Sequence, residues 1–108
     1  MKADADRTNK HYGGLDIHGD NIVFLNGSED PWQYAAMREI RHPNGTQANM
    51  SANYINCDEC AHCVDFHTPT EGQPQALTDA QDAVAQTVNG WLTAARAKRE
   101  AESIVFLE

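Results

Sequence analysis

The hydrophobic pattern of the chain begins with a short apolar run at residues 21–25, which reads Asn-Ile-Val-Phe-Leu. A continuous run of this length, rich in β-branched and aromatic residues and bounded by turn residues, predicts a strand buried on both faces of a sheet. Asp30 follows the run after an Asn-Gly pair, so it falls at the carboxyl end of the strand. Open α/β sheets carry their functional residues at that end.

A helix is expected directly after this strand, at residues 31–41. Asp30 suits the N-cap, Pro31 suits the first helical position, and Gln33 can return a hydrogen bond from the third position. The sequence His-Pro-Asn-Gly at residues 42–45 then ends the helix and turns the chain.

A second strand is expected at residues 50–57, where apolar and polar positions alternate. Residues 58–70 then form a loop that contains Cys60, Cys63 and two of the five histidines, and Cys57 lies directly before it. The sequence Glu-Gly-Gln-Pro at residues 71–74 is typical of a linker.

The longest periodic pattern predicts an amphipathic helix over residues 77–95. Thr78 and Gln81 match a capping box at its start. The apolar residues recur at helical spacing on one face, namely Leu77, Ala80, Val84, Val88, Trp91, Leu92 and Ala95. Beyond the helix, residues 104–107 form a short apolar tail that could pack or add a strand.

The order strand, acid, helix, strand, Cys/His loop, helix predicts an α/β fold built as a β-α-β-α unit with two adjacent parallel strands. Marginal stability is expected, because two strands leave edges and a face uncovered. A chain of 108 residues is one domain at most. Residues 1–11 are polar and without period, so we expect them to be disordered and residues 12–108 to hold the fold.

The charge of the chain limits its partners. Sixteen acidic residues against eight basic ones give a net charge of −8. Nucleic acids and anionic membrane surfaces both require a basic face, so neither is expected as a partner. No apolar run is long enough to span a bilayer, and the charged first ten residues do not form a signal peptide.

Asp30 and His62 are the first candidates for chemistry, because each follows an expected strand. In α/β-hydrolases a Ser-Asp-His triad appears along the chain in the order serine, acid, histidine. The imidazole takes the proton of the serine hydroxyl, and the carboxylate fixes the tautomer of the imidazole. Taken singly, Asp30 could equally be a helix cap and His62 a surface residue.

Three segments resemble one family of serine peptidases, which includes lysosomal Pro-Xaa carboxypeptidase, dipeptidyl-peptidase II and thymus-specific serine protease. Residues 21–32, Asn-Ile-Val-Phe-x-Asn-Gly-x-x-Asp-Pro-Trp, resemble the segment around the family's catalytic aspartate. Residues 12–14, Tyr-Gly-Gly, and residues 61–66, Ala-His-Cys-Val-Asp-Phe, resemble two further stretches. The second of these is similar to Ala-His-His-Leu-Asp-Leu, whose first histidine is catalytic. The resemblance covers residues 9–95.

The resemblance implies an α/β-hydrolase fold and exopeptidase activity beside proline. Asp30 would be the triad acid, His62 the triad base and Asp65 a structural residue. Trp32 and Trp91 are expected to be core residues, although Trp32, which is next to the acid, could line the site in an intact enzyme. The chain would be the carboxyl-terminal part of such a peptidase, with the missing amino-terminal part of the hydrolase domain and a peptide substrate as its partners. The resemblance implies no cofactor or metal. The parent protein would be lysosomal or secreted, where Asn26, Asn44 and Asn49 could accept glycans.

The family's nucleophile has no counterpart in these 108 residues. Gly-x-Ser-x-Gly is absent, and the three serines are Ser28, Ser51 and Ser103. None is expected on a strand-to-helix elbow flanked by glycines. The chain alone is therefore predicted to be inactive.

The cysteine-rich loop offers an alternative function. Cys57, Cys60, His62, Cys63 and His67 have side chains that bind zinc, and a zinc-stabilised or partner-binding module could use this loop. A structural zinc site usually takes two ligand pairs from separate segments, and His42 is the one distant candidate. A local disulfide between two of the three cysteines is the other alternative, and the family resemblance favours it.

Overall fold

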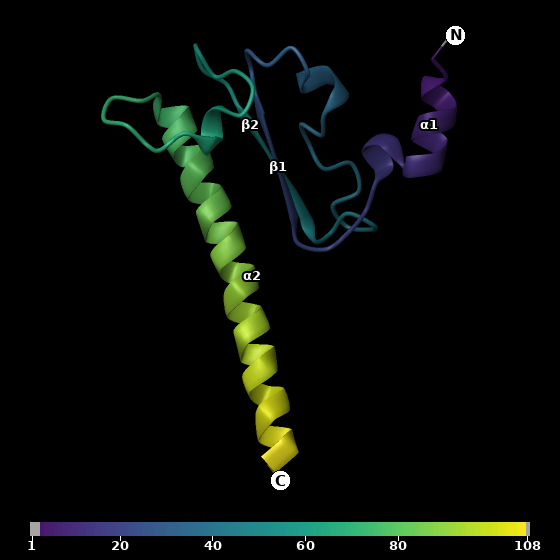
Figure 1. Ribbon diagram of the computed structural model, residues 1–108, viewed down its shortest axis with the longest axis vertical. Coiled ribbons are helices and arrows are strands. Elements are labelled where there is room, and N and C mark those ends of the chain that lie inside the picture. Colours follow the sequence, from purple (N-terminus) through teal and green to yellow (C-terminus); the bar gives the residue numbers. More distant parts are fainter. Residues whose placement is uncertain (1–2, 108) are drawn as a thin grey trace.

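The computed structural model describes residues 3–107 (Figure 1). Its strands are β1, Ile22–Gly27, and β2, Met50–Ile55, and its helices are α1, Ala5–Tyr12, and α2, Gln75–Leu107. Three single turns of 3-10 helix join them: η1 (Gly14–Asp16), η2 (Gln33–Ala35) and η3 (Val64–Phe66).

The two strands pair in parallel, as the sequence predicts, with Ile22 opposite Met50 and Gly27 opposite Ile55. The prediction that the first strand is buried on both faces is wrong for this chain, because its residues from Ile22 to Leu25 are only half-buried. Each strand has a single neighbour within the described residues, so much of the apolar run stays in contact with solvent.

Residues 31–41 do not form the expected helix. The segment contains only the turn η2, and the backbone becomes extended at Ala36, with φ −110° and ψ 163°. The amide of Asn26 at the end of β1 donates to the carbonyl of Met37 over 2.7 Å, and Met37 is buried. This tertiary hydrogen bond uses a carbonyl that a helix would have paired locally, and it holds the segment against the sheet.

Gln47 organises the rest of this long connection. Its side chain is fully buried. The Oε1 atom accepts from the backbone N–H groups of Arg41 and His42 at 2.9 and 3.0 Å. The Nε2 atom donates to the carbonyls of Leu15 and Ile17 at 2.9 and 2.8 Å. The four hydrogen bonds of this one side chain hold the connection in place where no helix or strand does so.

The amino-terminal segment also differs from the expectation of disorder, because Ala5–Tyr12 is helical. Asp4 caps this helix through a hydrogen bond from the N–H of Arg7 at 2.9 Å, and Gly13 ends it in the left-handed conformation. No residue of α1 is buried, so local capping, and not packing, accounts for the helix.

Helix α2 is longer than predicted at both ends. It begins at Gln75, so Thr78 lies inside the helix and the expected capping box does not form. Instead, the amide of Gln73 donates to Thr78 and to Gln81 at 2.8 and 2.9 Å. The tail at residues 104–107 neither packs nor adds a strand; it continues the helix, fully exposed.

The core is small and lies where the start of α2 meets the end of β2. Its buried members are Ile55, Cys60, Leu77 and Ala80. Only the last two come from α2. Half-buried residues of α2 continue as far as Trp91, and the helix beyond it runs away from the body (Figure 1). The radius of gyration is 17.8 Å, against about 13 Å for a compact domain of this length.

Neither helix of the described chain has the length and apolar character needed to cross a membrane.

Candidate active site

Asp30 lies just beyond the carboxyl end of β1, in a loop tied to the end of β2. The N–H of Ser28 donates to the carbonyl of Ile55 at 2.8 Å, and the N–H of Glu29 donates to that of Cys60 at 2.9 Å. Asp30 itself is buried, with 5% of its surface exposed. Because the parallel strands end at the same edge, these hydrogen bonds bring the loop after β1 against the loop after β2.

His62 comes from that second loop and meets Asp30 directly. The distance from Asp30 Oδ2 to His62 Nδ1 is 2.8 Å. The His62 side chain is 64% exposed while that of Asp30 is only 7% exposed. The carboxylate is thus held inside the protein and the imidazole stands over it at the surface.

The hydrogen-bond partners determine the ionisation state of Asp30. The hydrogen bond from His62 is the largest effect that holds the pKa of Asp30 below its usual range, and the hydrogen bond from the N–H of Trp32 adds to it. Burial of the carboxyl opposes both. An ionised Asp30 accepts the Nδ1 proton of His62, which leaves Nε2 of the neutral ring with a free lone pair.

A groove of about 310 Å³ opens beside the pair. Trp32, Cys63 and Phe66 line it together with Asp30 and His62. Trp32 is 67% exposed, so it is a lining residue of the site and not a core residue. The pair therefore faces a space that another molecule or another part of a larger protein could enter.

Gly27 allows the two loops to approach. A Cβ atom at this position would collide with the carbonyl oxygen of Cys60, and would lie 2.8 Å from the carbonyl oxygen of Ala61. Any other residue at position 27 would push the loop that carries His62 away from β1. The glycine of the Asn-Gly pair after the apolar run is therefore required on steric grounds.

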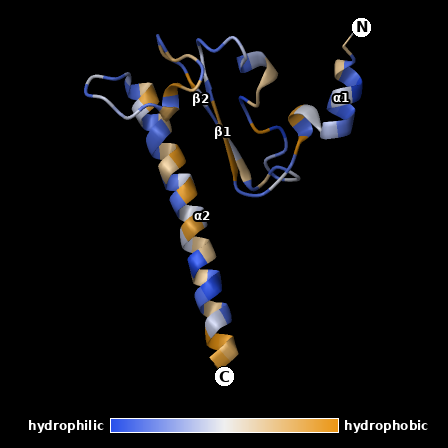
Figure 2. Ribbon diagram, viewed as in Figure 1, coloured by the Kyte–Doolittle hydropathy of each residue, from blue (hydrophilic) through white to orange (hydrophobic). Residues whose placement is uncertain are grey.

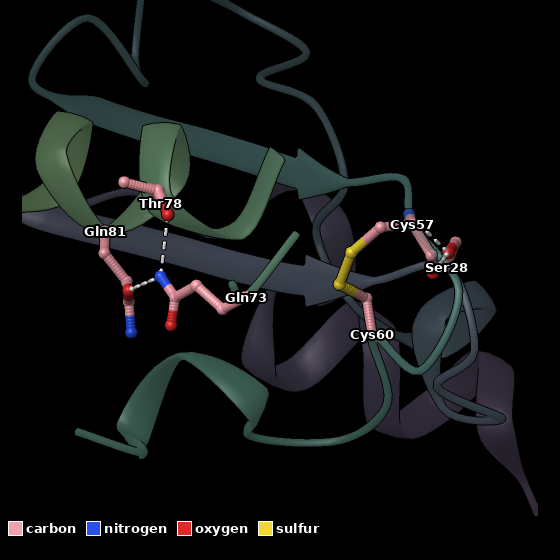
Figure 3. The surroundings of a disulfide bond; sticks show 6 residues. All are labelled: Ser28, Cys57, Cys60, Gln73, Thr78 and Gln81. Carbon is pink, nitrogen blue, oxygen red and sulfur yellow. Dashed lines mark hydrogen bonds between the residues drawn. A yellow bond between two sulfur atoms is a disulfide. The ribbon is translucent and has the colours of Figure 1, made fainter. Parts of the chain in front are cut away.

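A disulfide joins Cys57 to Cys60 across the base of the His62 loop (Figure 3). The hydroxyl of Ser28 donates to the carbonyl of Cys57 at 3.0 Å and accepts from its N–H at 3.2 Å. Cys60 is almost completely buried in the core. The bridge and Ser28 together fix the loop after β2 to the loop after β1.

This disulfide removes the basis for the zinc alternative. Two of its five candidate ligands, Cys57 and Cys60, are bonded to each other, and Cys63 is a free, exposed thiol. Within residues 3–107 no group of three or more His, Cys, Asp or Glu side chains converges as a metal site would require.

Sequence reasoning missed two features near the site. The first is Ser28, whose hydroxyl is a structural link; nothing in the local pattern distinguishes it from an ordinary turn serine. The second is Arg38, whose guanidinium lies over the rings of Tyr54 and Tyr34, with Cζ 4.3 and 5.4 Å from their centroids. Tyr34 and Arg38 lie in the connection after β1 and Tyr54 lies in β2, so no local pattern brings all three together.

Comparisons with known proteins agree with the geometry. The profile of the family described as serine carboxypeptidase S28 matches residues 1–84. A Caenorhabditis elegans protein named as a serine protease, K12H4.7, is 30% identical over 95 residues, covering 87% of this chain and 17% of that protein. EDA2 of Arabidopsis thaliana, also named as a serine protease, is 37% identical over 71 residues, covering 66% of this chain and 12% of EDA2.

The chain therefore spans less than a fifth of the length of these relatives. No solved structure matches it. The family match begins earlier than the expected residue 9 and stops at residue 84, so the projecting end of α2, with Trp91 and Leu92, lies outside it.

Proposed function

Since the chain belongs to the serine carboxypeptidase S28 family, whose fold is the α/β-hydrolase, we propose that Asp30 and His62 are the acid and base of its catalytic triad. The observation that carries this proposal is the 2.8 Å contact between Asp30 Oδ2 and His62 Nδ1 at the carboxyl edge of the parallel strands. In the triad, the aspartate fixes the imidazole tautomer and Nε2 removes the proton of the serine hydroxyl.

The nucleophile comes from outside these 108 residues. The hydroxyl of Ser28 is bonded to the backbone of Cys57, that of Ser103 is bonded within α2, and Ser51 is inside β2 without a hydrogen-bond partner for its buried oxygen. Within residues 3–107, none of the three serines is hydrogen-bonded to His62. The chain is a carboxyl-terminal piece of the hydrolase sheet, and the uncovered edges of β1 and β2 are where the rest of that sheet pairs.

The reaction is hydrolysis of a peptide bond near a peptide terminus, by a carboxypeptidase or a dipeptidyl-peptidase. Attack of the serine oxygen on the scissile carbonyl gives a tetrahedral intermediate, while the serine proton moves to His62 Nε2. The imidazolium is stabilised by Asp30 and gives its proton to the leaving amine as the C–N bond breaks, which leaves the acyl group on the serine. Water, deprotonated by His62 Nε2, then attacks this ester, and the proton returns to the serine oxygen as the acid product leaves. The groove lined by Trp32 and Phe66 receives the substrate beside the pair.

The first test uses the 108-residue chain and proton NMR. The Nδ1 proton of His62, bonded to a buried carboxylate, should give a downfield signal that is lost in Asp30→Asn. Asp65→Asn is the matched control, since Asp65 lines the same groove and makes no described contact with His62. Retention of the signal in Asp30→Asn would contradict the pairing.

The second test uses the parent protein that contains this segment and a serine nucleophile. Asp30→Asn and His62→Ala should each lower kcat by about 10³-fold or more, as loss of a triad member does, while Asp65→Asn should retain activity. Comparable activity in all three variants would refute the catalytic assignment.

A further inference from the structure

A second hollow lies next to the proposed active site and contains an unusual arginine. The cavity has a volume of about 440 Å³ and is lined by Tyr34, Arg38 and Tyr54, among others. The guanidinium of Arg38 lies over both tyrosine rings, with Cζ 4.3 Å from the centroid of Tyr54 and 5.4 Å from that of Tyr34. Cation–π contacts of this kind fix the plane of the guanidinium.

The charge of Arg38 has no acidic partner. No ion pair within 4.0 Å joins it to a carboxylate in the described part of the chain, which is unexpected in a protein of net charge −8. Its Nε atom is buried and donates to nothing. Glu39 and Arg41 also line the cavity, but Arg41 is paired with Asp16 at 3.3 Å and contributes little net charge.

The cavity shares a wall with the proposed catalytic groove. Ala36 lines both hollows. The hydroxyl of Tyr54 donates to Gln33 at 3.0 Å, and the amide of Gln33 donates to the carbonyl of Ser28 at 2.7 Å. A chain of two hydrogen bonds therefore connects the arginine cavity to the loop that presents Asp30.

We propose that Arg38, held over the rings of Tyr34 and Tyr54, is a binding site for a carboxylate group of a peptide. The contacts with the rings leave the N–H groups of the guanidinium as donors for a ligand, and a carboxylate accepts two of them at once. A peptide ammonium group is repelled by the same charge. The assignment of this carboxylate to a substrate rests on the proposed peptidase function, and it favours carboxypeptidase over dipeptidyl-peptidase action.

The test follows the Nε–H signal of Arg38 in the 108-residue chain by NMR during peptide titrations. Three peptides separate the sources of the carboxylate: acetyl-alanyl-prolyl-phenylalanine as the free acid, the same peptide as the amide, and an amidated peptide with glutamate in place of phenylalanine. The free acid should shift the signal in a saturable way and the first amide should not. If only the amidated glutamate peptide binds, Arg38 is a carboxylate site that recognises an acidic side chain and not the carboxyl terminus of a peptide.

Four variants make the result specific. Arg38→Gln should weaken binding about tenfold or more, as loss of a hydrogen-bonded charge does, and Arg38→Lys should recover only part of it because the paired donors are lost. Tyr54→Leu should also weaken binding, because it removes one ring. Lys98→Gln, which removes a positive charge from the exposed part of α2, should leave binding within about twofold. Spectra of β1 and β2 amides confirm that each variant is folded.

Two outcomes overturn the proposal: no saturable shift with either carboxylate peptide, or equal binding by wild type and Arg38→Gln. Asp30→Asn separates this result from the catalytic assignment, because it removes the proposed triad acid and leaves Arg38 in place. Carboxylate binding should persist in that variant.

Discussion

At the scale of single residues, the two oxygens of Asp30 have different partners. Oδ1 accepts the N–H of Trp32 and Oδ2 accepts the Nδ1 proton of His62, each over 2.8 Å. The first bond closes a turn of the backbone after Asp30, since the helix that Asp30 was expected to cap does not form. The second bond has the geometry of the proposed triad acid, and one carboxylate makes both because its oxygens face different groups.

The lowered pKa of Asp30 predicts a specific loss of stability in acid. A carboxyl whose pKa is lower in the folded than in the unfolded state adds stability that is fully present above the unfolded value, about 3.9. That stability is lost as the pH falls through the lower folded pKa. In His62→Ala the main cause of the lowered pKa is gone, so acid should reduce the free energy of unfolding less steeply than in wild type.

Urea titrations between about pH 5 and pH 2 measure this effect. His42→Ala is a useful comparison, because the hydrogen bond from His42 is the largest cause of the lowered pKa of Asp16, which is remote from the active site in sequence. His42→Ala should also make the loss of unfolding free energy in acid less steep, and this effect should be independent of that of His62→Ala. Identical acid responses in wild type and His62→Ala would show that the pair does not form in solution.

Gly27 gives a steric prediction at the same scale. Gly27→Ala places a methyl group against the carbonyls of Cys60 and Ala61, so the two loops must separate. We expect a loss of about 1–3 kcal/mol in the free energy of unfolding, together with loss of the His62 Nδ1 proton signal.

Gly90→Ala is the matched control for that substitution. Gly90 lies inside α2, and a Cβ there meets no atom within 4 Å. Alanine should stabilise the helix by about 0.5–1 kcal/mol, which circular dichroism can follow. If Gly27→Ala were as well tolerated as Gly90→Ala, close approach of the loops would not be what requires glycine at position 27.

At the scale of elements, the sequence predicted the strands better than the helices. The apolar runs of β1 and β2 are local patterns, and their parallel pairing follows from the connection between them. Helix 31–41 was predicted from capping residues alone, and the long-range bond from Asn26 to Met37 overrides it. The α1 helix was missed because its stability comes from Asp4 and Gly13 at its ends and not from an apolar face.

The disulfide is the element-scale feature whose removal is easiest to measure. Replacing Cys57 and Cys60 with serine should lower the free energy of unfolding by about 2 kcal/mol for such a short loop, and further because Cys60 is buried. Urea titration of the double variant and of wild type with and without a dithiol gives the value. Cys63→Ser, at an exposed free thiol, should be neutral. An equal effect of reductant on wild type and on the double variant would contradict a role for the bridge.

At the scale of the whole molecule, the Asp30–His62 site could be predicted and the Arg38 cavity could not. The ends of parallel strands must meet at one edge, so the order of Asp30 and His62 along the chain was sufficient to bring them together. Arg38 meets Tyr54 because a long irregular connection, held by Gln47 and Met37, folds back over the sheet. No local pattern specifies that path, since its hydrogen bonds join residues far apart in sequence.

Helix α2 has two parts that differ in burial. Leu77 and Ala80 are buried in the core, whereas the helix beyond Trp91 is exposed on all sides and ends in the apolar side chains of residues 104–107 (Figure 2). An exposed apolar end of this kind promotes association between chains. Between these two parts, Gln81, Ala83, Val84, Thr87 and Trp91 are half-buried. The part of α2 up to Trp91 therefore holds the fold, and the part beyond it contributes little or nothing.

Truncation after Ala95 tests this division. The shortened chain should keep its urea midpoint and the His62 Nδ1 signal, and it should sediment as a smaller species at high concentration if residues 104–107 drive association. Leu77→Ala should cost about 2–5 kcal/mol, as loss of a buried leucine does, while Leu92→Ala, at a position 51% exposed, should change stability by less than about 0.5 kcal/mol. A lowered midpoint in the truncated chain would mean that the projecting helix packs against the body in solution. The small core at Ile55, Cys60, Leu77 and Ala80 would then not be the only support of the active-site loops.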